Sequence, residues 1–349
     1  MEVSFAAVIA TFAANPVLLL IVILCLGATI VNGATDAPNA IATVVGTKAM
    51  RPGPAIAMAA VFNFIGLLLI TSISTAVAST IFGMVDFGGD NHAALVALAA
   101  AMVAIIVWGV AAWAFGIPTS QSHSLIAGIT GAAIALQGGL GGINFDQWVK
   151  VIYGLIISTC LGFCSGWLFT RLIKIICKHA NRTKANHFFK WAQIISGAGV
   201  ALLHGAQDGQ KFLSLTMLAV MLGVYGTSDM NGFPLWMVVL VSLTMSLGTA
   251  VGGRKIIKSV GMSMVKMEQF QGFAACLSAC FCIGLATFTG MPVSTTHTKT
   301  TAIMGVGAEK RLRAVKWNLA GTMVLTWVLT FPGCGLLAYL FTHLFLLFM

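Results

Sequence analysis

Charged residues are scarce in this sequence. Lys, Arg, Asp and Glu make up 8% of the 349 residues, whereas hydrophobic residues make up 58%. Soluble domains carry about a quarter charged residues, so the composition excludes a soluble globular core. Apolar stretches of about 20 residues recur along the chain, and stretches of that length predict transmembrane helices. The sequence therefore predicts an all-α polytopic membrane protein.

Acidic residues are even rarer than basic residues. Nine Asp and Glu stand against 19 Lys and Arg, which gives a net charge of +10. In a soluble protein this excess would suggest binding to nucleic acid. In a chain this apolar, cationic loops held on the cytoplasmic side of a bilayer explain it. We therefore expect a lipid bilayer as a partner and no nucleic acid.

The sequence also lacks the usual signs of catalysis. It contains no Walker-type loop, and no nucleophile–base pair or metal cluster stands out. The eight cysteines lie mostly inside apolar segments. The pairs Cys160–Cys164 and Cys276–Cys280 have no second pair of metal ligands near them, which favours a packing role. We expect neither an enzyme nor a resident cofactor.

Two motifs, in contrast, occur twice. NGATDAPNA (32–40) is echoed by HGAQDGQKF (204–212), and GIPTSQSHS (116–124) is echoed by GMPVSTTHT (290–298). The offsets, 204 − 32 = 172 and 290 − 116 = 174, are each close to half the chain length. Two motifs in the same order at nearly the same spacing indicate that the chain consists of two related halves.

Loops at equivalent places in the halves carry opposite charge. KAMRPGP (48–54) is basic and its counterpart YGTSDMNG (225–232) is acidic, whereas VDFGGDNH (85–92) is acidic and its counterpart at 252–269 is basic. Because cationic loops stay in the cytoplasm, equivalent loops should lie on opposite sides of the membrane. The halves are therefore predicted to be inverted-topology repeats.

This inversion defines the organisation of the chain. We assign residues 1–175 to the first repeat and 191–349 to the second, joined by a basic cytoplasmic linker at 176–190. Inversion requires an odd number of membrane crossings in each half. Five crossings in each half, together with broken or re-entrant segments, give about 10 or more membrane segments. Both termini would then lie outside.

Some of these segments have unusual lengths. Those at 5–46 and 191–224 are long for one crossing, and those at 118–137 and 292–307 are short. Interrupted segments within inverted repeats are typical of secondary transporters, whose binding site lies near the middle of the membrane. We expect broken or re-entrant helices at the four motifs.

The serine motifs predict an anion site. Pro118 and Pro292 suit the first turn of a helix, and the hydroxyls after them can cap free backbone N–H groups that also bind anions. Plain N-capping explains one such turn, but two opposed copies favour a shared site for an oxyanion such as phosphate or sulfate. The candidate ligands are Ser120, Gln121, Ser122, Ser294, Thr295 and Thr296.

Asp36 and Asp208 are the other matched pair. A carboxylate at the centre of a membrane helix costs roughly 2.5–3.5 kcal/mol, so two at equivalent positions favour a coupling-cation site over a helix cap. Asn39 and Gln207 offer amide oxygens beside them. Asp36 and Asp208 would hold the metal ion if the cation is Na⁺. An anion near two carboxylates requires a compensating cation, which is a physical reason for symport.

Four further residues are secondary candidates. Thr35 precedes Asp36, and His123 and His297 end the serine motifs. A buried, hydrogen-bonded histidine explains the latter two about as well as a functional role does. Lys299 is positioned to contact an anion, although snorkelling to the membrane surface is an equal alternative.

The motifs GATD (33–36), GAQD (205–208), PTSQSH (118–123) and PVSTTH (292–297) resemble those of the inorganic phosphate transporter (PiT) family, and HGAQDGQK resembles its bacterial branch. The resemblance extends over nearly the whole chain. Thr35 and Gln207 stand where the family usually has Asn. Cys276 stands where many members have Glu.

The resemblance implies phosphate uptake driven by Na⁺ or H⁺, a homodimer, and a place in the bacterial plasma membrane. We expect a secondary active symporter that works by alternating access. A sulfate symporter on the same scaffold is the alternative, and an anion channel is a third candidate.

Overall fold

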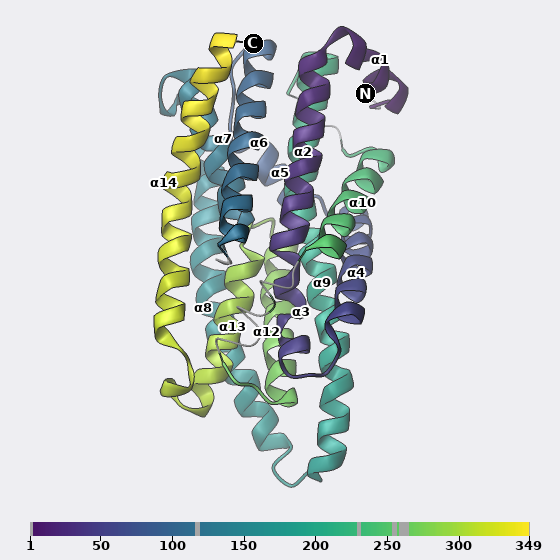
Figure 1. The fold of residues 1–349 in the computed structure, drawn as a ribbon, viewed down its shortest axis with the longest axis vertical. Helices are drawn as coiled ribbons and strands as arrows, with labels where there is room; N and C mark the ends of the chain where they lie inside the picture. Colours follow the sequence, from purple (N-terminus) through teal and green to yellow (C-terminus); the bar gives the residue numbers. More distant parts are fainter. Residues whose placement is uncertain (1–2, 116–118, 229–231, 253–256, 258–264, 349) are drawn as a thin grey trace.

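The computed structural model describes residues 3–115, 119–228, 232–252, 257 and 265–348, and nearly all of them are helical (Figure 1). Among these residues the only β-contact is a bridge between Val85 and Ile143. The helices before the linker are α1 (Phe5–Ala14), α2 (Pro16–Thr35), α3 (Ala37–Gly46), α4 (Pro52–Ile73), α5 (Ala76–Phe82), α6 (Asn91–Ala114), α7 (Gln121–Gln137) and α8 (Phe145–Ile176). Those after it are α9 (Arg182–Val220), α10 (Leu235–Val251), α12 (Gln269–Phe288), α13 (Thr295–Lys310) and α14 (Trp317–Phe348).

Nearly all of the described residues are helical, which confirms the all-α class. Within the described ranges, six helical stretches are long and apolar enough to cross a membrane. They are Pro16–Gly46, Pro52–Ile73, Asn91–Ala114, Phe145–Ile176, Gln269–Phe288 and Ala320–Phe348. The surface is apolar too, since Ile175, Val251 and Leu329 are exposed. Apolar side chains outside and polar ones at the centre are what a bilayer requires.

The segment predicted at 5–46 is broken where expected. Asn15 separates α1 from α2, and at the motif α2 ends at Thr35 and α3 begins at Ala37, so the interruption there is confined to Asp36. Pro38 explains it, because proline has no N–H for a helical hydrogen bond and its ring clashes with the carbonyl four residues earlier. The break is a single residue rather than a long unwound stretch.

The second Asp motif does not break its helix, and this part of the prediction was wrong. α9 continues through residues 204–212 to Val220, where a π-turn, Met221–Tyr225, follows. HGAQDGQKF contains no proline, and helices tolerate isolated glycines. Asp208 therefore projects from an unbroken helix.

The linker is shorter than predicted. Only residues 177–181 lie between α8 and α9, because residues 182–190 already belong to α9. This hairpin forms one end of the bundle, and the two chain termini lie at the other end (Figure 1). α7 lies in the half of the bundle toward the termini, whereas α13 lies in the half toward the hairpin (Figure 1).

The glycines of the two Asp motifs make close contacts between helices. A Cβ on Gly33 of α2 would overlap the backbone of Met245 in α10, and a Cβ on Gly205 of α9 would overlap the backbone of Asn63 in α4. Gly33 and Gly205 are the same position in the two Asp motifs. Small residues let membrane helices approach this closely. The motif glycines therefore fix α2 on α10 and α9 on α4.

A second set of glycine contacts shows the same correspondence. A Cβ on Gly131 of α7 would overlap the backbone of Gly335 in α14, and a Cβ on Gly305 of α13 would overlap the backbone of Phe163 in α8. Gly131 and Gly305 are 174 residues apart (305 − 131), the offset of the serine motifs. Gly131 and Gly305 therefore make the same kind of close contact with a neighbouring helix.

Candidate functional site at the centre of the bundle

The serine motifs begin two helices in the same way. The side chain of Ser120 accepts a hydrogen bond from the backbone N–H of His123 at 3.3 Å. The side chain of Ser294 accepts one from the N–H of His297 at 3.2 Å. Both serines are therefore N-caps, and the first turns of α7 and α13 follow them.

The turn before α13 explains two residues of its motif. Gly290 has a φ of 69°, in the left-handed region that favours glycine. Pro292 lies two residues before the cap Ser294 rather than in the first helical turn, so that detail of the prediction was wrong. Gly116 and Pro118, the matching residues of the first motif, lie outside the described residues.

The first turns of α7 and α13 meet each other. The rings of His123 and His297 contact edge to face, with centroids 4.2 Å apart. The His297 ring also stacks on Trp327 of α14 at 3.6 Å. Neither ring nitrogen of His297 has a hydrogen-bond partner among the described residues. The first turns of α7 and α13 therefore lie side by side.

Asp208 lies at this meeting point and is fully buried. Its carboxylate is contacted from four helices. Within α9 it pairs with Lys211 at 2.7 Å and with His204 at 3.2 Å. From the other helices it accepts hydrogen bonds from Ser122 (3.3 Å), Thr295 (3.1 Å) and Asn32 (3.4 Å). Two of the predicted anion ligands therefore contact a predicted cation ligand.

Lys211 brings a positive charge into the same place. Its ammonium donates to Ser122 Oγ at 2.5 Å, to Asp208 Oδ1 at 2.7 Å and to the backbone carbonyl of Val293 at 2.6 Å. The side chain is fully buried. Unpaired buried charges are expensive, and this arrangement pairs both charges.

Asp36 is held differently. One carboxylate oxygen, Oδ2, accepts the backbone N–H of Gln121 at 3.1 Å, the first residue of α7. The other oxygen, Oδ1, has no hydrogen-bond partner among the described residues. Because Gln121 and Ser122 are adjacent, both aspartates contact the same turn of α7. The predicted pairing of Asp36 with Asp208 at one site is therefore compatible with the geometry.

The remaining cation candidates are spread around this centre. Asn39 donates to Thr296 Oγ1 at 2.8 Å. Gln207 donates to the carbonyl of Met291 at 3.2 Å, beside the turn before α13. Thr35 donates to the carbonyl of Val31 in its own helix, a local bond that ties its hydroxyl to α2.

Lys299 is buried, so the snorkelling alternative was wrong. Its ammonium donates to Cys276 Sγ at 3.0 Å, and the same sulfur lies 3.1 Å from Thr43 Oγ1. Lys299 lies one helical turn after Thr295 on α13, and residues four apart share a helix face. It therefore continues the polar stripe of α13 toward the linker end.

Sequence reasoning missed three members of the centre: Lys211, His204 and Asn32. The spacing of His204, Asp208 and Lys211 on one helix could have identified two of them, because residues three and four apart are neighbours on a helix surface. His204 contacts the Asp208 carboxylate and also Asn63 at 3.0 Å.

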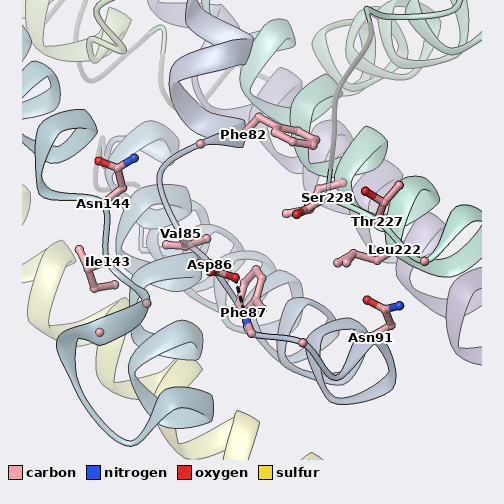
Figure 2. Close-up of a pocket in the computed structure, with 17 residues that line it drawn as sticks. Phe82, Val85, Asp86, Phe87, Asn91, Ile143, Asn144, Leu222, Thr227 and Ser228 are labelled. Atoms are coloured by element: carbon pink, nitrogen blue, oxygen red, sulfur yellow. Dashed lines mark hydrogen bonds between the residues drawn. The ribbon is translucent and has the colours of Figure 1, made fainter. Parts of the chain in front are cut away.

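The centre is closed to solvent, since the candidate side chains on α2, α3, α7, α9 and α13 are all buried. A separate pocket of about 660 Å³ lies between residues 82–91, 141–144 and 218–228. Figure 2 shows Asp86 and Phe87 within it, with Asn144 on one side and Leu222 on the other. The α9 helix connects the pocket to the centre, because Leu218 is ten residues, about 15 Å, beyond Asp208.

An apolar exterior, helices of membrane-spanning length and a buried polar centre define a multi-pass helical membrane protein. The model described as the phosphate transporter family matches residues 32–338. The chain belongs to that family, and the resemblance stated from the four motifs is confirmed. It is a transport protein rather than an enzyme.

The relatives match along most of the chain. A probable low-affinity inorganic phosphate transporter of Bacillus subtilis is 38% identical, over 92% of this chain and 96% of the relative. One of Rhizobium meliloti is 35% identical, over 94% and 96%. A solved structure described as the sodium-dependent phosphate transporter has a TM-score of 0.86 and 21% identity, covering 96% of this chain and 100% of that chain. At 21% identity, this last similarity shows a shared fold.

Proposed function

We propose that this protein is a secondary active symporter that imports inorganic phosphate together with Na⁺ or H⁺. The meeting of two helix N-termini at two buried carboxylates is the observation that carries the proposal. Helix N-termini favour anions, and carboxylates favour cations. One closed site therefore offers binding groups for both ions of a symport reaction.

Phosphate binds at the first turns of α7 and α13 in this proposal. Ser122 and Thr295 direct their hydroxyls to Asp208, and hydroxyls rotate to serve another acceptor. Ser120, Gln121, Ser294 and Thr296 are the remaining neutral donors in this proposal. Donors of this kind bind an oxyanion without the strong retention expected of a dense arginine cluster.

The coupling cation binds on the carboxylate side. Asp36 Oδ1, Asn39 Oδ1 and Gln207 Oε1 are buried oxygens without a hydrogen-bond partner among the described residues. Buried oxygens are normally hydrogen-bonded, so these exceptions favour a cation ligand. A proton on Asp36 or an Na⁺ ion between such oxygens would satisfy them. Because the solved neighbour is described as sodium-dependent, Na⁺ is the first cation to test.

Inverted repeats and alternating access support each other. The recurrence of glycine contacts between equivalent helices supports a two-fold relation of the halves. The placement of α7 and α13 in opposite halves of the bundle supports the inversion (Figure 1). Rocking of one repeat against the other around a fixed central site is the usual consequence of this architecture.

The topology follows from the same arrangement. The basic α8–α9 hairpin would lie in the cytoplasm of a bacterial cell by the positive-inside rule, and both termini would lie outside. A membrane-impermeant maleimide should label Ser4→Cys in intact cells and His179→Cys only after permeabilisation, relative to the parent's own cysteines. Labelling of His179→Cys in intact cells would contradict this orientation.

The proposal also includes the homodimer that the family resemblance implies. Cross-linking of the same cysteine variants in membranes tests it.

Uptake of radiolabelled phosphate into proteoliposomes tests the function. Uptake should require an imposed Na⁺ or H⁺ gradient and should saturate. Sulfate should compete poorly, because HPO₄²⁻ carries a proton that Asp36 Oδ1 can accept and sulfate carries none at neutral pH. Stronger transport of sulfate would favour the alternative substrate. Conductance without a gradient of a coupling ion would indicate a channel.

A further inference from the structure

Lys211 has an unusual environment for a lysine. Its ammonium is fully buried and donates three hydrogen bonds at 2.5–2.7 Å, each to an oxygen. An ammonium has three donors and no acceptor, so its hydrogen-bonding capacity is used completely. Oxygens of a hydroxyl, a carboxylate and a backbone carbonyl are also the ligands that hard cations such as Na⁺ take.

The equivalent position of the first repeat carries a neutral residue. The offset of the Asp motifs, 172, relates Lys211 to Asn39 and Asp208 to Asp36. Asn39 makes the corresponding contact, because its amide donates to Thr296 Oγ1 at 2.8 Å, whereas Lys211 donates to Ser122 Oγ. Thr296 and Ser122 are themselves equivalent in the serine motifs. The halves therefore share a contact geometry and differ by one positive charge.

The two carboxylates reflect this difference. Asp208 is paired with the Lys211 ammonium. Asp36 makes no ion pair with any described residue, and its Oδ1 atom has no hydrogen-bond partner there. The amide oxygen of Asn39, three residues after Asp36, is likewise buried without a partner among the described residues. Asp36 therefore keeps an unsatisfied carboxylate oxygen, whereas both carboxylate oxygens of Asp208 accept hydrogen bonds.

We propose that Lys211 is a tethered cation that occupies the coupling-cation position of the second repeat, so that one mobile coupling cation binds, at Asp36. The proposal rests on the proposed symport function and specifies its ion stoichiometry. A tethered ammonium neutralises Asp208 beside the anion but does not cross the membrane. It therefore contributes to binding of phosphate without contributing to the driving force.

Lys211→Asn tests this assignment, because it places in the second repeat the residue that the first repeat already has. The reversal potential of phosphate transport, with equal pH on both sides of the proteoliposome membrane, gives the charge moved per phosphate. Relative to the parent, Lys211→Asn should move about one additional positive charge per phosphate, and its uptake should rise more steeply with cation concentration, from a Hill coefficient of about 1 toward about 2.

Two control variants separate the charge from the side-chain volume. Lys211→Arg keeps the positive charge. The phosphate that this variant transports should therefore be accompanied by the same number of coupling cations as in the parent. Lys211→Met removes the charge and supplies no oxygen, so it should lose most phosphate uptake. Normal uptake by Lys211→Met with the parent's ion dependence would overturn the proposal.

The parent protein provides a test that does not depend on any variant. Its reversal potential should correspond to one coupling cation per phosphate. Two coupling cations per phosphate in the parent, or identical stoichiometry in the parent and Lys211→Asn, would refute the tethered-cation assignment while leaving the symport proposal intact. Absence of gradient-driven uptake in the parent would instead refute the symport proposal itself.

Discussion

The imidazoles of His123 and His297 meet edge to face at the centre of the bundle, 4.2 Å apart between ring centroids. These residues occupy the same position in two motifs that are 174 residues apart in the sequence (297 − 123). Their contact brings the first turns of α7 and α13 together. The aspartates of the other motif pair lie against these turns, which gives four sequence-predicted motifs one common location.

The two aspartates should differ in stability although both are required for transport. Asp36→Asn and Asp208→Asn should each abolish gradient-driven uptake. Asp208→Asn leaves the buried Lys211 ammonium without its partner, and breaking such a pair costs about 3–5 kcal/mol. Asp36 has no described ion pair, so Asp36→Asn should cost much less. Thermal unfolding in detergent measures the difference, and equal melting temperatures for the two variants would contradict the pairing.

The cap Ser294 allows stability and binding to be separated. Ala at an N-cap costs about 0.5–2 kcal/mol, whereas Gly costs only a few tenths. Both Ser294→Ala and Ser294→Gly remove the hydroxyl, so both should raise the KM for phosphate roughly 2- to 10-fold. Only Ser294→Ala should lower the melting temperature appreciably. An unchanged KM in Ser294→Gly would show that the hydroxyl serves as a cap alone.

Lys299 should affect the anion rather than the fold. Lys299→Met removes a buried ammonium whose described hydrogen bond is to a thiol, so stability should change little. Loss of a charge-assisted contact should raise the KM for phosphate roughly tenfold or more. Lys174→Met is the control, because Lys174 is exposed and pairs with Glu309 near the linker end. The same KM in both variants and the parent would exclude Lys299 from the anion path.

The close approach of α4 to α9 depends on glycine. A Cβ on Gly66 would overlap the backbone of Leu202, and backbone overlap of this kind costs about 1–3 kcal/mol. Gly53→Ala is the matched control, since a Cβ there meets no atom within 4 Å. Gly66→Ala should lower the melting temperature and Gly53→Ala should not. Equal melting temperatures would mean that the helices separate without cost.

Much of this fold is predictable from the sequence because single residues determine where several helices end and begin. Pro38 interrupts a helix by its chemistry, and Ser120 and Ser294 begin helices as N-caps. The break expected at Asp208 failed for a physical reason. Asp208 is satisfied by Lys211 and His204 within the same helix, so no freed backbone is needed to accommodate it. Partners of this kind depend on side-chain packing, which a single sequence does not specify.

The role of Lys299 shows the same limit. Lysine near a helix start is compatible with snorkelling, and only the packing of α12 on α13 places its ammonium on Cys276. The convergence of His123 and His297 was accessible from the repeat, whereas their contact with Trp327 was not, because no motif pointed to α14.

Initial rates of phosphate uptake into proteoliposomes, with and without an inward Na⁺ or H⁺ gradient, test the central claim most directly. The account predicts saturable accumulation of phosphate that requires one of these gradients and is lost in Asp36→Asn. Phosphate accumulation that is independent of both gradients, or an Asp36→Asn variant that accumulates phosphate like the parent, would contradict it.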